Sequence, residues 1–456
     1  MRSSSANGAT RVDAPDPDAN DRHEAYRRIG RRLIPFLMFL WIMAWLDRVN
    51  ISFAKLQMSH DLNFSEAVYG LGAGIFYIGY LFFEVPSNLL LQRIGARKTI
   101  VRITIGWGLL SAATAFVTTP GMFYLLRFLL GACEAGFYPG IILYLTHWYP
   151  SSRRAKIFGV FMSSVALSGV IGGPLAGLLM THFNGTLGLA GWKWVFIMEG
   201  IPSVLGGLIA LGYLTDKLDH ATWLSGRQRA LVRAELDRDH VELGPREHEF
   251  SSALRDPLLW MFTTIYFGII VGNATVAFWG PTIVSELSGL GIAQVGWIIS
   301  GISLCGAAGM IANGTWSDRS GNARKCATMA LFSGAMGLLG LALFWQSSPI
   351  AGIVAFALAL AGAYSTIPVF WQMPNAVFTG TAAAGAIAII NSFGNLGGFV
   401  APYALGMLRE RNEGVRSGLV AVAFVEILAC YLIVRFVRTS SVANSHVTAA
   451  RSSTNG

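Results

Sequence analysis

Apolar residues occur along the chain in long runs, and polar stretches separate these runs. About 20 apolar residues are enough for one helix to cross a bilayer. The pattern therefore predicts twelve transmembrane helices, and a polar stretch over 215–256 divides them into two sets of six. The alternating ten-residue pattern of a membrane barrel is absent from the sequence. The predicted spans are 33–53, 67–89, 99–118, 121–145, 156–181, 194–214, 257–284, 293–315, 325–345, 350–373, 381–407 and 417–437.

These runs predict an all-α membrane protein in five parts. We expect two six-helix bundles, over 33–214 and 257–438, joined by a partly helical cytoplasmic linker over 215–256. The polar ends, 1–32 and 439–456, are expected to be disordered cytoplasmic tails. No short apolar region with a cleavage site follows the first tail, so we do not expect a cleaved signal peptide.

Composition agrees with a membrane protein and excludes several other classes. Hydrophobic residues make up 53% of the 456 residues and charged residues 13%, whereas soluble domains are about 25% charged. The four cysteines are scattered without metal-site spacing, so we expect free thiols. The sequence contains no Walker loop, metal cluster or nucleophile elbow. We therefore expect no enzyme activity, no catalytic residues, no cofactor and no metal.

Lys and Arg lie mainly on one side of the predicted membrane. Because the number of spans is even, both tails share a side, and that side holds 27 Lys and Arg against 5 on the other. The positive-inside rule places both termini and the linker in the cytoplasm. The net charge of +9 is then explained by a basic cytoplasmic face, so nucleic acid is not expected as a partner.

The loops after the second and eighth predicted spans are alike. Arg93 and Gly95 in the first loop lie 226 positions before Arg319 and Gly321 in the second. Any short cytoplasmic loop can carry Arg and Gly, but a match of both loops in register favours two parallel repeats of six spans. Glycine permits a tight turn, and an Asp-Arg pair can tie neighbouring helix ends together. We therefore predict a gating role for Arg93, Asp318 and Arg319.

Four charged residues lie at similar depth inside predicted spans. Asp47 and Arg48 are in the first span, and Arg127 and Glu134 share one face of the fourth, about 10 Å apart. Charges at membrane depth usually face a partner or a watery cavity. Two arginines can bind a carboxylate, and a carboxyl beside them can carry a proton. The cluster suits a proton-coupled anion carrier; the alternative is that salt bridges within it only fix helix packing.

Further polar residues in the spans are candidates for a binding site or a gate. Tyr80 lies near mid-depth and could donate a hydrogen bond to a substrate or only pack between helices. Glu84 lies nearer the cytoplasm, where we expect a gating or helix-tying role. Trp371 lies between two prolines that predict a broken helix beside a cavity, so it could cap a ligand or anchor the membrane interface. Asn391 is a candidate for substrate contact, whereas Glu199 is expected to be structural.

The paired loops resemble the Gx3DRxGRR motif of the major facilitator superfamily. The first loop departs from the motif, with Asn88 and Gln92 in place of its glycine and aspartate. Within that superfamily, DRxN at 47–50, R-x6-E-A-x3-P at 127–139 and GAIAIINSFGNLGGF at 385–399 are similar to the anion:cation symporter group. The resemblance covers about residues 30–440. It implies the major facilitator fold, alternating access between two six-helix bundles, and a place in the bacterial inner membrane.

The resemblance also implies a substrate class and roles for residues. It implies proton-coupled uptake of a small organic anion, such as tartrate or another hydroxy or aromatic carboxylate, by a monomer. Val165 stands where some sugar-acid carriers have a glutamine, which argues against a strongly hydroxylated substrate. The alternatives are sugar-acid uptake, proton-driven efflux of an organic compound, and a non-transporting sensor. In this group the positions matching Asp47 and Glu134 are implicated in proton coupling. Those implicated in substrate contact match Arg48, Arg127, Tyr80, Trp371 and Asn391.

Overall fold

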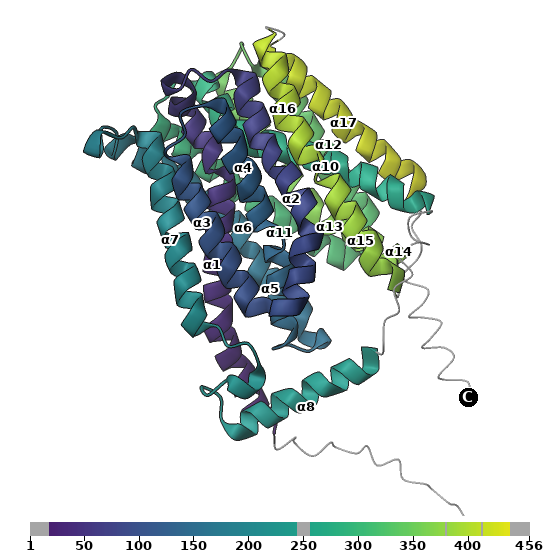
Figure 1. Cartoon of the computed structure of the whole chain (residues 1–456). Coiled ribbons are helices and arrows are strands. Elements are labelled where there is room, and N and C mark those ends of the chain that lie inside the picture. Colours follow the sequence, from purple (N-terminus) through teal and green to yellow (C-terminus); the bar gives the residue numbers. More distant parts are fainter. Residues whose placement is uncertain (1–17, 244–255, 379–380, 412–413, 438–456) are drawn as a thin grey trace, which may run out of the picture.

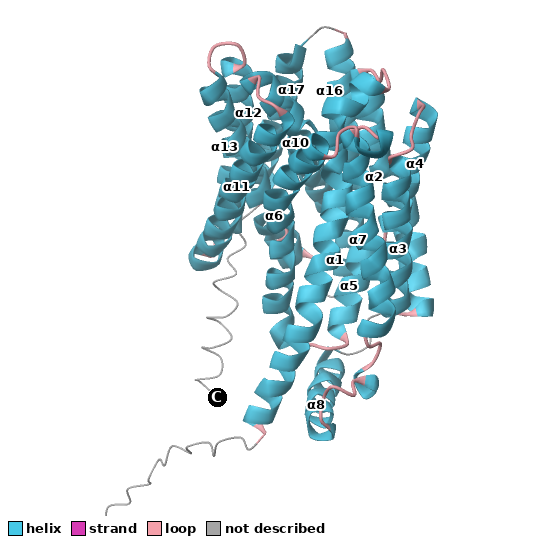
Figure 2. Cartoon of the chain, turned by 90° about the vertical axis from the view of Figure 1, so that its left-hand side faces the viewer, coloured by secondary structure: helices cyan, strands magenta, loops and turns pink. Residues whose placement is uncertain are grey.

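The structure is a computed structural model, and it describes residues 18–243, 256–378, 381–411 and 414–437. Within these residues the chain forms helices and loops and no strand (Figure 2). The first half contains α1 (Ala19–Asp61), α2 (Glu66–Ile94), α3 (Ala96–Thr114), α4 (Pro120–Glu134), α5 (Phe137–Thr146), α6 (Ser151–His182) and α7 (Gly191–Tyr213). The linker contains α8 (Gly226–Leu243). The second half contains α10 (Pro257–Ser288), α11 (Ile292–Ser320), α12 (Ala323–Phe344), α13 (Pro349–Phe370), α14 (Gln372–Val377), α15 (Thr381–Gly394), α16 (Gly397–Glu410) and α17 (Gly414–Phe436).

These helices make twelve membrane crossings. In the described chain, ten helical stretches are long and apolar enough to cross a membrane, with α4–α5 and α13–α14 each counted as one stretch. The other two crossings are α3, whose beginning carries Arg97, Lys98 and Arg102, and α15–α16, which is interrupted near Leu396. The predicted twelve-helix architecture is confirmed.

The two halves pack in the same way. The third and sixth crossings of each half contact each other, as α3 with α7 and as α12 with α17. The second and fourth crossings also pair in both halves, as α2 with α4 and as α11 with α13. Each half therefore forms its own bundle, and the two bundles stand side by side (Figure 1). Because the number of crossings is even, α1 begins and α17 ends on the same side, which we call the terminus side; the opposite side is the far side.

The beginning of α1 differs from the prediction. We expected residues 1–32 to be a disordered tail, but α1 already begins at Ala19. Its first turns have a folded partner in α8, because the hydroxyl of Tyr26 donates a hydrogen bond to Glu235 over 3.0 Å. Residues 1–17 lie outside the described part of the chain. The polar residues 19–32 are thus part of α1, and their contact with α8 stabilises them as a helix.

The linker helix α8 lies on the terminus side of the first bundle (Figure 1). Val232 is fully buried, and Asp239 accepts a hydrogen bond from Arg154 at the start of α6 over 3.0 Å. The expectation of a partly helical linker is correct for this segment. The rest of the predicted linker, 244–255, and the predicted tail, 439–456, fall outside the described residues.

The two bundles approach most closely on the far side. Where α6 crosses α11, a Cβ on Gly296 would lie 2.3 Å from the carbonyl oxygen of Gly173. Where α2 crosses α16, a Cβ on Gly70 would lie 2.4 Å from the carbonyl oxygen of Pro402. A Cβ on Gly296 or Gly70 would therefore force the helices apart, and small residues at such crossings let backbones approach closely. All four residues belong to the far-side halves of their helices, so the structure is closed between the bundles on that side.

Candidate functional site

An ion pair joins α1 to α4 inside the first bundle. Arg48 donates a hydrogen bond to the carboxylate of Glu134, and Glu134 is only 3% exposed. The guanidinium of Arg48 also lies over the rings of Trp45 and Phe76, 4.8 and 5.1 Å from their centroids. Removing one partner of a buried pair leaves the other charge uncompensated, which is strongly unfavourable. Each member of the pair therefore depends on the other while both are charged.

The second buried arginine, Arg127, is bonded through only one of its nitrogens. Its Nε donates to the carbonyl oxygen of Gly72 over 3.2 Å, and the residue is 1% exposed. Both terminal nitrogens, Nη1 and Nη2, are buried and have no hydrogen-bond partner among the described residues. Buried polar groups are normally hydrogen-bonded. Arg127 thus presents a fork of unused donors of the kind that a carboxylate can satisfy.

The helix that carries these residues is broken next to the ion pair. We expected one continuous apolar span over 121–145, but α4 ends at Glu134 and α5 begins at Phe137. Between them Gly136 has a φ of +88°, in the left-handed region that favours glycine. In the tenth crossing α13 and α14 meet at Trp371, which keeps helical φ and ψ of −64° and −19°, so the expected break is only a local irregularity there. The break at Gly136 lies next to Glu134, where regular helix packing stops.

Aromatic side chains from both bundles surround the ion pair. The ring of Tyr80 is 5.9 Å from the guanidinium of Arg48. From the second bundle, Tyr266 of α10 packs against Trp371 with centroids 4.9 Å apart. Tyr266 also lies close enough to Tyr77 and Tyr80 to interact with them electrostatically. The predicted residues Arg48, Tyr80 and Trp371 therefore converge, and the sequence analysis missed Tyr266, which connects them across the bundles.

Glu84 and Asn391 contact each other across the two bundles. The carboxylate of Glu84 accepts hydrogen bonds from the side chains of Ser392, over 2.7 Å, and Asn391, over 3.3 Å. Asn391 itself accepts one from Asn395 over 3.3 Å. The predicted gating residue and the predicted substrate-contacting residue are thus partners, and they link α2 to α15 on the terminus-side half of the molecule.

Asp47 lies apart from the other three charges. Its carboxylate accepts hydrogen bonds from Ser111 of α3 over 2.5 Å and Ser203 of α7 over 2.9 Å. The residue is 2% exposed, and no basic side chain in the described part of the chain forms an ion pair with it. The expectation that all four charges form one contact cluster is therefore wrong. Arg48, Glu134 and Arg127 lie among α1, α2 and α4, whereas Asp47 faces α3 and α7.

The residues predicted to act as gates in the two short loops are exposed. Arg93 and Arg319 form no ion pair within the described residues. Asp318 accepts one long hydrogen bond, 3.5 Å, from Gln372. The structure therefore brings none of these three together with the buried charges, and their gating role stays a prediction.

Two other arginines of the same loops tie helix ends together. Arg97 donates to the carbonyl oxygen of Leu211 at the end of α7, and Arg324 donates to that of Val434 at the end of α17. These helices are the sixth crossings of the two halves, so both repeats use an equivalent contact. The loop motif contained these arginines, but the sequence analysis had assigned the ties to the Asp-Arg positions.

A network of ions joins the bundles on the far side. Lys55 of α1 pairs with Glu66 of α2 over 3.0 Å, and Arg409 of α16 pairs with Glu66 over 3.0 Å and with Glu286 of α10 over 2.5 Å. Both cations lie over the ring of Trp279, which is fully buried. The sequence alone does not predict this network, because isolated charges at span ends are ordinary. Its position suits it to hold the far side closed.

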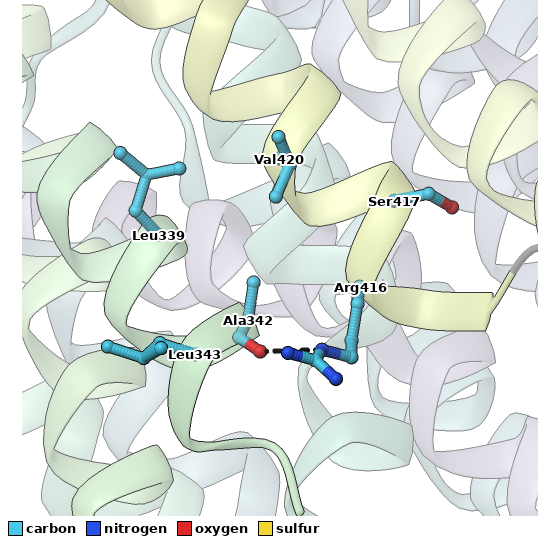
Figure 3. A pocket seen from close by; sticks show the side chains of 6 residues that line it. All are labelled: Leu339, Ala342, Leu343, Arg416, Ser417 and Val420. Carbon is cyan, nitrogen blue, oxygen red and sulfur yellow. Dashed lines mark hydrogen bonds between the residues drawn. The ribbon is translucent and has the colours of Figure 1, made fainter.

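A hollow at the far-side ends of α12 and α17 is a poor alternative site (Figure 3). Its one charged residue, Arg416, donates through Nε to the carbonyl oxygen of Ala342 over 2.9 Å. Apart from Ser417, the other lining side chains are apolar, and none of the buried charges described above reaches it. Among the residues that the structure describes, no group of His, Cys, Asp or Glu could hold a metal ion.

Comparisons with known proteins agree with this architecture. The family model "Major Facilitator Superfamily" matches residues 37–402 and 288–452. The chain is 42% identical over 409 residues to "Putative metabolite transport protein NicT" of Pseudomonas putida, covering 90% of this chain and 93% of that protein. It is 41% identical over 414 residues to a "Putative tartrate transporter" of Agrobacterium vitis, covering 91% and 95%. It is 38% identical over 412 residues to "Quinolone resistance transporter" of Acinetobacter baumannii, covering 90% and 94%.

The fold is also found among solved structures. A bacterial homologue of the human lysosomal transporter Spinster, in an inward-facing and occupied conformation, superimposes with a TM-score of 0.71 at 17% identity. The match covers 90% of this chain and 96% of that one. The chain therefore belongs to the major facilitator superfamily, and it is a multi-pass membrane transporter and not an enzyme.

Proposed function

We propose that the protein takes up a small organic anion together with protons, across the inner membrane of a bacterium. The observation that carries this proposal is the buried guanidinium of Arg127, whose two terminal nitrogens have no hydrogen-bond partner in the described residues. A carboxylate accepts two parallel hydrogen bonds from such a fork. Two relatives, 41% and 39% identical, are named putative tartrate transporters and support an organic acid as the substrate. The class is tartrate or another hydroxy or aromatic carboxylate.

The pair of Arg48 and Glu134 supplies a coupling between anion and proton. While Glu134 is ionised it occupies Arg48, so only Arg127 is available to the anion. When Glu134 takes a proton, its negative charge is lost and Arg48 can turn to the substrate. With Glu134 protonated, the net charge of Arg48, Arg127 and Glu134 rises from +1 to +2, and a dicarboxylate can then bind both arginines. Binding of the proton and binding of the anion thus favour each other.

The other residues of the site give the proposed substrate its surroundings. Tyr80 and Tyr266 offer hydroxyl donors, and Trp371 offers a flat apolar surface next to them. Asn391 is bonded to Glu84 in this structure, so it contacts substrate only when that link opens. Asp47 is proposed as a second proton carrier, which acts from the interior of the first bundle. These assignments suit an anion of few heavy atoms held between the bundles.

Alternating access follows from the contacts between the bundles. The structure is closed on the far side by the contact of Gly173 with Gly296 and by the network around Arg409. On the terminus side, Glu84 links the bundles through Asn391. We place the terminus side in the cytoplasm because 27 Lys and Arg lie on that side of the predicted membrane against 5 on the other. The substrate would then leave toward the cytoplasm once the link between Glu84 and Asn391 opens.

Transport by purified protein in lipid vesicles tests the proposal. Labelled tartrate and an aromatic carboxylate such as benzoate are offered to vesicles with an imposed inward proton gradient. We expect accumulation above equilibrium that a proton ionophore abolishes. Accumulation that is indifferent to the gradient would rule out coupling, and failure of all carboxylates in a thermal-shift screen would rule out the anion site, because a bound ligand stabilises the native state.

Proton-driven efflux is the second candidate function. One relative, 38% identical, is named a quinolone resistance transporter. The same vesicles distinguish the two candidates, because efflux exchanges the compound against the entering proton. Accumulation driven by a gradient of the opposite sign would favour efflux over uptake.

A further inference from the structure

A second buried carboxyl lies beside Asp47. Glu199 in α7 is 2% exposed and precedes Ser203 by one helical turn. The single hydroxyl proton of Ser203 is within reach of two acceptors, the carboxylate of Asp47 at 2.9 Å and the backbone carbonyl oxygen of Glu199 at 3.1 Å. Asn50, which follows Asp47 on α1 and is 2% exposed, adjoins the carboxyl of Glu199. The two carboxyls are therefore held in one polar cluster between α1 and α7.

The cluster has an order along the membrane normal. The first crossing runs toward the far side and the sixth runs back, so α1 and α7 are antiparallel. Asn50 lies about one turn beyond Asp47 toward the far side, and Glu199 lies one turn beyond Ser203 in the same direction. The carboxyl of Glu199 is thus the far-side member of the pair, and Asp47 is the member nearer to the coupling site.

The surroundings of the two carboxyls contain no ion-pairing cation among the described residues. Arg48, next to Asp47 in the chain, is turned away to Glu134, and Oε2 of Glu199 has no hydrogen-bond partner in the part of the chain that the structure describes. Two carboxylates buried together without a cation cannot both stay ionised at low cost. The groups that face them are Asn50 from α1, Trp107 and Ser111 from α3, Glu134 from α4 and Ser203 from α7.

We propose that Glu199 exchanges a proton with Asp47 and forms the far-side part of the proton path of this transporter. In the exchange an O–H bond at one carboxyl breaks and an O–H bond at the other forms, so the negative charge moves the opposite way. Asp47 of α1 then holds the proton, and its carboxyl interacts electrostatically with that of Glu134 on α4. The inference rests on the proposed proton coupling and reverses the expectation that Glu199 is only structural.

The second repeat provides a matched control. Glu426 of α17 follows Glu199 by 227 positions, the same interval that separates Arg97 from Arg324. Glu426 is likewise buried, at 1% exposed, and packs against Gly272 and Gly334. The loop after α11 is one residue longer than the loop after α2, so before these loops the interval between matching positions is 226. The position that matches Asp47 is therefore Asn273, whose side chain cannot take up or release a proton in this way. Glu426 therefore has the burial of Glu199 without its carboxyl partner.

The test compares Glu199→Gln with Glu426→Gln in reconstituted vesicles. Each variant is assayed for tartrate accumulation under a gradient of about one pH unit, which supports at most about tenfold accumulation per coupled proton. Each is also assayed for counterflow exchange, which needs no net proton movement, and for proton entry with a trapped pH indicator. We expect Glu199→Gln to lose accumulation and proton entry while keeping counterflow, and Glu426→Gln to keep all three.

Two outcomes overturn the inference. If Glu199→Gln accumulates substrate like the unchanged protein, the residue is not on the proton path. If it loses counterflow as well, and Glu199→Asp does not restore accumulation, its role is structural. A failure of the proposed function itself has a different signature, because the unchanged protein would then show no dependence on the proton gradient.

Discussion

Glu134 pairs with Arg48 of a neighbouring helix and not with Arg127, which lies on its own helix. The reason is geometric, because seven residues of α-helix separate the Cα atoms of Arg127 and Glu134 by about 10 Å. Arg48 reaches Glu134 from α1 instead. The two arginines are therefore unequal: Arg48 is occupied by a carboxyl, whereas the terminal nitrogens of Arg127 have no hydrogen-bond partner among the described residues. Each should respond differently to substitution.

Arg127→Ala is expected to lose most of the affinity for the anion. Removing one partner of a buried charge-assisted pair typically costs about 2–5 kcal/mol, which is roughly 30-fold or more in affinity. Titration calorimetry with tartrate measures the effect. Arg127→Lys is the matched control, because it keeps the charge and loses the two-pronged geometry, and it should bind with intermediate affinity. An unchanged affinity in Arg127→Ala would remove this residue from the site.

Glu134→Gln is expected to separate binding from coupling. The neutral side chain imitates a protonated Glu134 and frees Arg48, so anion binding should persist and lose its dependence on pH. Accumulation driven by a proton gradient should disappear while counterflow exchange continues. The measurement is transport in both modes by the same vesicles. Normal accumulation by this variant would show that the proton is carried elsewhere.

The crossings could be predicted from the sequence because the bilayer requires about 20 apolar residues for each of them. The same reasoning does not find where a helix bends or extends. The break at Gly136 depends on a local backbone conformation that hydropathy does not report. The early beginning of α1 at Ala19 depends on contacts such as that of Tyr26 with Glu235, 209 positions away. The hydropathy pattern contains neither the backbone conformation at Gly136 nor the contact of Tyr26 with Glu235.

The depth of each buried charge in the membrane could be counted along its helix. Which neighbouring helix each charged side chain faces could not be predicted in this way. Consecutive residues on a helix point about 100° apart. Asp47 and Arg48 therefore face different helices, and Asp47 meets Ser111 and Ser203. Counting depth alone placed both charges in one cluster. Knowing which helices surround α1 was needed to separate them.

Arg409→Gln is expected to favour opening of the far side. Arg409 connects Glu66 of the first bundle with Glu286 of the second, and those carboxylates are partly exposed. Only the pair with Glu66 crosses between the bundles, and one partly exposed pair contributes about 0–1 kcal/mol, so the change should raise the open population roughly fivefold at most. The exposed Arg411 nearby is the control, and Arg411→Gln should have no effect. High salt should weaken the difference.

Reactivity of an introduced cysteine measures this opening. Ala293 is partly exposed and lies against Gly177 of α6, so a cysteine at that position is partly shielded while the far side is closed. In a background without the four native cysteines, Ala293→Cys should react faster with an impermeant maleimide when Arg409→Gln is added. Equal rates in the Arg409→Gln and Arg411→Gln variants would contradict a role for the network in closure.

Gly296→Ala is expected to prevent closure on the far side altogether. The added Cβ would lie 2.3 Å from the carbonyl oxygen of Gly173, a backbone atom that can yield only if α6 and α11 separate. Substrate should still bind from the far side, but accumulation should be lost and labelling at position 293 should be fast. Gly301→Ala on the same helix is the matched control, because a Cβ there meets no atom within 4 Å. Alanine is also the better helix former by about 1 kcal/mol, so this variant should transport normally. If Gly296→Ala transports as well as Gly301→Ala, the close contact of the two glycines is not required for the transport cycle.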